Sequence, residues 1–271
     1  MTELADRAER ELNAILAQYT AGEAEVVRAY FERPHTPDEY ADMLRRQMGR
    51  EIFCVAWLEG TARMAAEVER STERHHFAAL LKQIAEEVKH YVLLADVAEW
   101  VLGRPLGGEE ARAYEVYAAP NPSLPRERHH NPRLPEANAM IDLLWRFRIE
   151  NPSEFSDEVM HLSEGGGGAA FLEASRLTGD EFRERFAAAM RAIAEDELEH
   201  GPLRVRGFVA HYVHGEADLA LATRLLREVM AQHLRVRNEI YGYPLSPERL
   251  AAIDRGAIEP WQMPAPVAAS A

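Results

Sequence analysis

Residues 59–90 read EGTARMAAEVERSTERHHFAALLKQIAEEVKH, and this stretch decides the fold class. It starts at Glu59 in an apolar helical pattern, breaks at the helix-capping pair Ser71-Thr72 and ends on a Glu-x-x-His motif. Two helices joined by a tight turn fold back on each other. We therefore expect an antiparallel helical hairpin here.

The same order recurs over residues 164–200. Glu164-Gly165 precedes a helix stop at Thr178-Gly179-Asp180, and an acidic residue with a second Glu-x-x-His motif follows. The repeat predicts a second hairpin like the first. A proline-rich stretch at residues 118–135 is long enough to connect the two.

Helical periodicity also covers most of the remaining chain, and the alternation typical of strands is missing. We predict an all-α fold, a four-helix bundle of two hairpins with one long crossover and additional N- and C-terminal helices. Residues 1–258 are expected to form one domain and 259–271 a mobile tail. The expected helices cover residues 3–31 (one or two helices), 37–70, 72–102, 136–149, 153–177, 181–214 and 218–241, with a short one after Pro247.

Composition excludes several classes of function. The 271 residues include 31 Lys and Arg against 45 Asp and Glu, a net charge of −14, which argues against nucleic acid or an anionic membrane as a partner. Cys54 is the single cysteine, so this chain alone builds no disulfide, zinc ribbon or iron–sulfur cluster. No signal peptide and no apolar run of about 18 residues is present, which predicts a cytoplasmic protein without membrane spans.

The Glu-x-x-His motif is where we expect chemistry, because residues three apart project from the same face of a helix. Six copies occur in the chain. Two of them, Glu87/His90 and Glu197/His200, lie on helices whose hairpin partner carries a glutamate at the same height. Of the other four, Glu32/His35 contains a proline, Glu73/His76 begins a helix, Glu127/His130 lies in the crossover and Glu158/His161 faces two leucines.

The partner glutamate follows from the position of each turn, because residues at equal distance from a turn lie at the same height. Glu59 as partner of the first motif places that turn at about residue 74, and Glu164 as partner of the second motif places its turn at about residue 181. Both positions coincide with capping signals. Glu51 remains an alternative in the first hairpin, with a turn at about residue 70.

The acidic residue before each motif glutamate has an expected role as well. A metal-bound histidine usually donates its other N–H to a carboxylate. We assign Asp196 to this role beside His90, and Glu86 beside His200. His161, one turn before Glu164, is a candidate extra ligand; a histidine of the core or surface is the alternative.

This arrangement resembles the ferritin-like diiron carboxylate proteins, whose pattern is a glutamate, about 30 residues, then Glu-x-x-His, twice over. The resemblance covers about residues 38–213 and implies two bound iron ions, or iron with manganese. Four glutamates would balance the charge of two Fe(II) ions. By resemblance, Glu59 and His90 bind one metal, Glu164 and His200 bind the other, and Glu87 and Glu197 bridge them.

A run of four glycines follows Glu164: Gly165, Gly166, Gly167 and Gly168. Each costs a helix about 1 kcal/mol relative to alanine. We interpret the run as an unwound or π-bulged segment that opens a substrate cavity beside the metals. Close packing of two helices is the alternative.

Three functions remain open. The two symmetric half-sites favour an enzyme that activates O₂ for hydroxylation, N-oxygenation or oxidation of a small organic substrate. Electrons would come from a separate reductase or ferredoxin, or from the substrate. A ferroxidase or iron-handling protein and a metal-free helical interaction protein are the alternatives, and a homodimer is left open.

Overall fold

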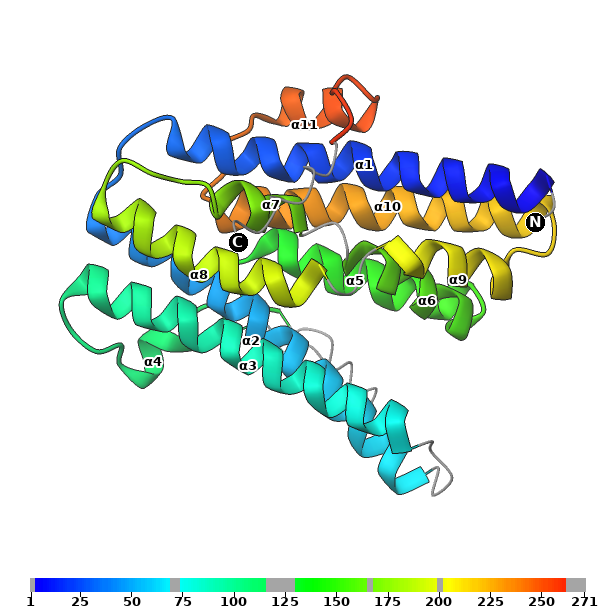
Figure 1. The fold of residues 1–271 in the computed structure, drawn as a ribbon, viewed down its shortest axis with the longest axis horizontal. Coiled ribbons are helices and arrows are strands. Elements are labelled where there is room, and N and C mark those ends of the chain that lie inside the picture. The colour runs from blue at the N-terminus through cyan, green and yellow to red at the C-terminus, as the bar shows by residue number, and fades with distance from the viewer. Residues whose placement is uncertain (1–2, 69–73, 116–129, 165–167, 199–201, 262–271) are drawn as a thin grey trace, which may run out of the picture.

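The computed structural model describes residues 3–68, 74–115, 130–164, 168–198 and 202–261; for Glu59 and Glu164 it describes the backbone alone. All regular structure within these ranges is helical, as expected, and they contain no strand (Figure 1). The helices are α1 (Glu3–Phe31), α2 (Pro37–Val68), α3 (Arg74–Leu102), α4 (Gly108–Ala111), α5 (Pro135–Glu150), α6 (Ser153–Glu164), α7 (Gly168–Ala174), α8 (Glu181–Leu198), α9 (Pro202–Tyr212), α10 (Glu216–Ile240) and α11 (Pro247–Asp254).

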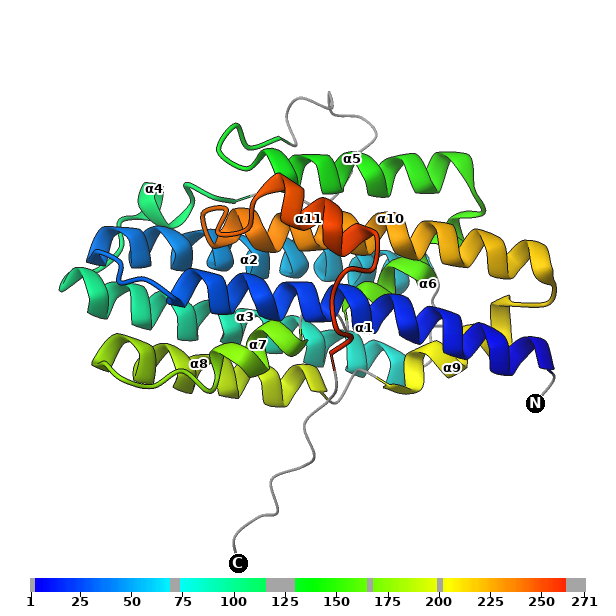
Figure 2. The ribbon, with the colours of Figure 1, turned by 90° about the horizontal axis from the view of Figure 1, so that it is seen from above.

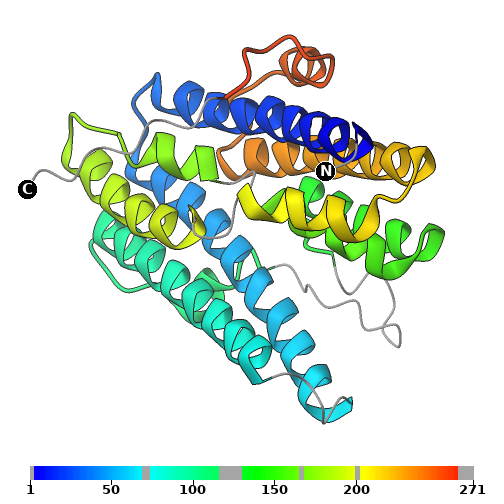
Figure 3. The ribbon, with the colours of Figure 1, turned by 45° about the vertical axis from the view of Figure 1, so that its right-hand side comes forward.

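Helices α2 and α3 form the expected antiparallel hairpin, which extends away from the other helices at its turn end (Figure 3). The turn lies between Val68 and Arg74. At the other end of the hairpin, α3 packs against α8 in antiparallel orientation, since Lys89 contacts Asp196 while Arg185 lies over the ring of Trp100. Helix α3 therefore packs against both α2 and α8.

Helices α1 and α10 lie side by side and run in the same direction (Figures 1 and 2). Arg7 pairs with Glu216 and Glu23 pairs with His233, so the offset between paired residues is nearly constant, 209 and 210. Gly22 allows this approach, because a Cβ at that position would lie 3.1 Å from the Leu234 side chain. In the view of Figure 2, α5 lies on one side of this pair of helices and α8 on the other.

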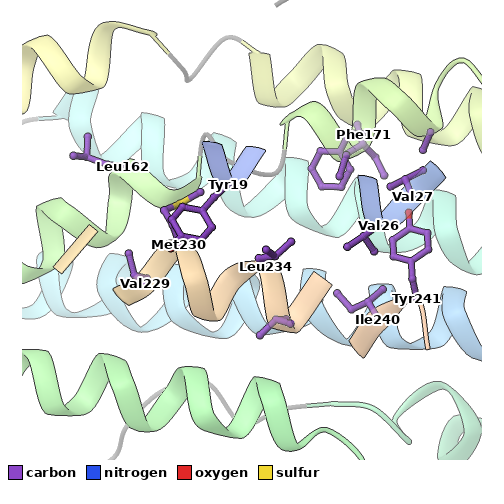
Figure 4. Close-up of a cluster of buried hydrophobic side chains, with 14 of the residues drawn as sticks. Tyr19, Val26, Val27, Leu162, Phe171, Val229, Met230, Leu234, Ile240 and Tyr241 are labelled. Atoms are coloured by element: carbon purple, nitrogen blue, oxygen red, sulfur yellow. The ribbon is translucent and has the colours of Figure 1, made fainter. Parts of the chain in front are cut away.

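The hydrophobic core follows from this arrangement. Side chains from α1, α6, α7 and α10 meet in one cluster, part of which is drawn in Figure 4. Phe186 of α8, Leu44 of α2 and Leu94 of α3 extend the same cluster toward the hairpin, and all three are fully buried. Burial of each such side chain stabilises the fold by about 1.5–3 kcal/mol.

The break between α7 and α8 agrees with the sequence signals. Gly179 adopts φ +117°, and the Asp180 carboxylate accepts a hydrogen bond from the Arg183 backbone N–H at 2.8 Å, so α8 begins where a stop and an N-cap were predicted. The helix expected over residues 153–177 is described as α6 and α7. Residues 165–167 between them lie outside the description.

Over residues 181–214, expected to form one helix, the structure describes α8 and α9, and residues 199–201 between them lie outside the description. Pro202 begins α9. Proline has no N–H to donate to the preceding turn but suits the first position of a helix, so it favours a new start over continuation.

Two further expectations concern the ends and the exterior. The Trp261 backbone N–H donates to the Ala17 carbonyl at 3.1 Å, so the described part of the expected mobile tail lies against α1. Residues 262–271 of the tail and residues 116–129 of the crossover are outside the description.

None of the described helices combines the length and apolarity needed to cross a bilayer.

Candidate metal centre

The centre is built on α3, where Glu87 and His90 lie three residues apart on one face. The face is turned inward, because Leu94, Val97 and Ala98 further along the helix belong to the core. His90 is consequently 1% exposed. An imidazole and a carboxylate are thus carried by one helix into the interior.

Helix α2 adds Glu51, which is 4% exposed. His90 Nδ1 lies 3.8 Å from Glu51 Oε2 and 3.7 Å from Glu87 Oε2. Ligand atoms of these three residues all lie within 4.8 Å of one another, and among the described residues this group could hold a metal ion.

Helix α8 approaches the same histidine from the other side. Asp196 Oδ2 lies 3.1 Å from His90 Nε2, and Glu197 Oε1 lies 4.0 Å from His90 Nδ1. Asp196 also accepts a hydrogen bond from Lys89 Nζ at 2.7 Å. One nitrogen of His90 is therefore held by Asp196, while the other faces Glu51, Glu87 and Glu197.

These distances fit a cation better than direct hydrogen bonds. Separations of 3.7–4.0 Å exceed the usual hydrogen-bond length of about 2.7–3.2 Å. A metal about 2.0–2.2 Å from each nitrogen or oxygen ligand holds neighbouring ligand atoms about 3–4 Å apart. His90 Nδ1 and Glu87 Oε2 are also buried without a hydrogen-bond partner, which is costly unless something else binds them. A metal fits these residues.

The electrostatics of the group agree with this interpretation. Burial disfavours the charged form of His90, but Glu51 and Glu87 outweigh it and raise the pKa of the imidazole to about 10. Burial, together with Glu51, raises the pKa of the Glu87 carboxyl to about 7. Burial opposes ionisation of Glu51 too, yet His90 and Gln47 lower its pKa. Without a metal, the group keeps a positive charge at its centre by holding a proton on His90.

The structure brings together four of the residues that we predicted from the sequence: Glu87, His90, Asp196 and Glu197. Asp196 contacts His90 as expected. Among the described side chains, the carboxylate that α2 contributes is Glu51, the alternative that we left open. Since α2 ends at Val68 and α3 begins at Arg74, the midpoint of the hairpin is at about residue 71, which places Glu51 closer to the height of the motif than Glu59.

The other predicted residues are not part of the described group. Glu59 lies two turns beyond Glu51, about 12 Å along the axis, and its side chain is outside the description. His161 is 43% exposed at its side chain and faces Glu158 at 3.7 Å. Glu86 pairs with Lys82 at 3.1 Å. The Glu164 side chain, His200, Gly165, Gly166 and Gly167 lie outside the described residues, whereas Gly168 begins α7.

Comparisons of this chain with protein-family models, with curated proteins and with solved structures give no match. The findings so far are an all-helical chain and a buried Glu51, Glu87 and His90 group that could hold a metal.

Proposed function

We propose that the chain is a ferritin-like protein that binds two iron ions, or iron with manganese, and uses them to oxidise a small organic substrate with O₂. The observation that carries this proposal is His90, held at Nε2 by Asp196 and facing three carboxylates at Nδ1. Histidine with several carboxylates is the ligand set of non-haem iron proteins of this type.

A dinuclear centre is the finer part of the proposal. Glu197 supports it, because it faces His90 from α8, the helix that leads to His200. In the proposed centre, Glu51, Glu87 and His90 would hold one metal, Glu164 and His200 would hold the other, and Glu87 and Glu197 would be shared by both. Four carboxylates neutralise two divalent ions, which allows the reduced centre to be buried. The bundle topology is proposed on the same grounds.

The chemistry that two reduced iron ions supply is the activation of O₂ by electron transfer. The residues of the chain have other tasks. Asp196 orients the imidazole by accepting from Nε2, so that Nδ1 points at the centre. The core residues around α3 exclude water from the group. The substrate cavity is proposed at Gly165–Gly168, and electrons are proposed to come from a separate donor or from the substrate.

Metal content tests the proposal. We expect the protein from iron-supplied cells to hold about two metals per chain, and Glu87→Ala or His200→Ala to empty at least one position. Glu158→Ala, which changes a Glu-x-x-His pair outside the group, is the matched control. Metal-free wild-type protein from such cells would favour a helical interaction protein instead.

Titration with Fe(II) under air separates an enzyme from an iron-handling protein. Uptake that stops at about two ions per chain fits the proposed centre. Uptake of tens of ions per chain would favour the ferroxidase or storage function.

A further inference from the structure

A continuous row of buried polar side chains leads from α10 and α1 to the candidate metal centre. His233 Nδ1 lies 2.6 Å from Glu23 Oε1, and Arg237 Nε donates to Glu23 Oε2 at 3.2 Å. Arg237 Nη1 donates to Gln47 Oε1 at 2.8 Å, and Gln47 Nε2 donates to Glu51 Oε1. We call this row of five residues, which ends on Glu51, the buried polar row.

Stability alone is a weak reason for such a row. All of its members are buried, from 0% exposure for Glu23 to 6% for His233. Burying charges costs free energy, and buried ion pairs can often be replaced by apolar residues of similar size without loss. Since the row ends on a carboxylate of the candidate centre, its effect on that carboxylate is the more informative feature.

The order of donors and acceptors fixes how the Gln47 amide points. Arginine has donors alone, and an ionised carboxylate has acceptors alone. A glutamine between them satisfies both in one orientation, with its carbonyl oxygen toward Arg237 and its NH₂ toward Glu51. Arg237 is itself held in place, by Glu23 and by the ring of Phe171, whose centroid lies 5.1 Å from the guanidinium carbon.

The consequence for Glu51 is that its two oxygens differ. Oε1 accepts from Gln47, and Oε2 faces His90 Nδ1 at 3.8 Å. We propose that Gln47 is a positioning residue, held by Arg237 and Glu23, that leaves Oε2 of Glu51 as the oxygen that binds the metal. The inference rests on the proposed metal-binding function and adds a role for helices outside the Glu-x-x-His repeat.

Co²⁺ binding to the whole chain tests this role. Gln47→Met keeps the length of the side chain and removes the donor to Glu51; Gln47→Asn stays polar but is one methylene too short to reach both partners. We expect both to weaken Co²⁺ binding by about ten- to hundredfold, as replacement of groups that orient a ligand usually does, and to shift the visible absorption bands of bound Co²⁺.

Gln232→Met is the matched control, because Gln232 is a half-buried glutamine of α10 whose amide donates to the Glu136 carbonyl at 2.9 Å and not to a member of the buried polar row. It should bind Co²⁺ as wild type does. Wild-type affinity and unchanged bands in both Gln47 variants would overturn the positioning role while leaving the metal centre intact. Failure of the wild-type chain to bind Co²⁺ would overturn the proposed function and this inference together.

Discussion

His90 Nε2 and Asp196 Oδ2 lie 3.1 Å apart, although 106 residues separate them in the chain. The contact joins α3 to α8 and determines which nitrogen of the buried imidazole faces Glu51, Glu87 and Glu197. It is the contact between the two halves of the repeat on which the proposed chemistry depends most directly.

Asp196→Asn should therefore weaken metal binding without unfolding the protein. The amide keeps the shape of the carboxylate but holds the imidazole less firmly, so we expect a loss of affinity of about ten- to hundredfold. Isothermal titration with Mn²⁺ measures it. Glu195→Gln removes the neighbouring, exposed carboxylate of α8 and should leave the affinity unchanged; equal losses in both variants would point to a general effect of charge.

The choice between Glu51 and Glu59, the two candidate ligands of α2, can be measured directly. Glu51 lies 3.8 Å from His90 Nδ1, while Glu59 is about 12 Å further along the helix. We expect Glu51→Gln to lower the metal content by at least one ion per chain, and Glu59→Gln to lower it less. Metal analysis of the two variants measures both losses. A larger loss of metal in Glu59→Gln than in Glu51→Gln would indicate that Glu59 is the ligand.

The metal-free protein should lose stability as the pH rises. The folded-state pKa of Glu87 is about 7, above its ordinary value of 4.5, and that of His90 is about 10, above 6.5. Their contributions are fully present below the ordinary values and are lost as the pH rises through about 7 and about 10. We expect the Tm of the metal-free protein to fall by about 5 °C or more over this interval.

Metal should reverse that trend, because it binds the deprotonated ligands and so stabilises the fold more at high pH than at low pH. His90→Gln should remove the part of the decline between about pH 6.5 and pH 10. His161→Gln, which changes a half-exposed histidine, should retain the decline. A pH-independent Tm of the metal-free wild-type protein would contradict the charge distribution that we describe.

Glu23→Gln tests the energetics of the buried polar row. The change leaves Arg237 buried with a neutral partner, so we expect a cost of about 3–5 kcal/mol in the free energy of unfolding at neutral pH. Glu25→Gln, two residues away, breaks a surface pair with Arg249 and should cost about 1 kcal/mol or less. Urea unfolding of the three proteins gives both numbers, and equal costs would contradict a special role for the buried carboxylate.

The same variant has a predicted pH dependence. Burial opposes ionisation of Glu23, but His233 and Arg237 outweigh it and lower its pKa to about 2, from 4.5. The stabilisation is present above pH 4.5 and is lost as the pH falls toward 2. The difference in stability between wild type and Glu23→Gln should therefore shrink over that interval.

Local signals predicted much of the fold. Capping residues such as Asp180, and the breaks at proline and glycine, place most helix ends within a few residues of those observed. The sequence also predicts that Glu87 and His90 lie next to each other, because residues three apart share one face of a helix. Asp196 follows from the repeat, since its place before Glu197 mirrors that of Glu86.

Contacts between distant helices were harder to predict. The sequence places a turn to within a few residues, and a difference of that size decides whether Glu51 or Glu59 lies at the height of the motif. The buried polar row was missed, although Glu23 and Arg237 lie on the same helical faces as buried residues such as Tyr19 and Met230. A charged residue at a position where the helical pattern expects an apolar one is a signal of a buried charge. The sequence does not show its partner, which depends on the packing of α1 against α10.

The parallel pairing of α1 and α10 has a consequence for biosynthesis. Arg237 lies 190 residues after Gln47 in the chain and is therefore synthesised much later. Because α1 and α10 run in the same direction, they are not the two arms of a local hairpin, and α1 has no contact with α10 until α10 has been made. While the chain is still being made, Glu51 lacks the support that α10 provides. Binding of metal at the proposed centre should thus strengthen once α10 has been made, and products that end before Arg237 should bind metal more weakly.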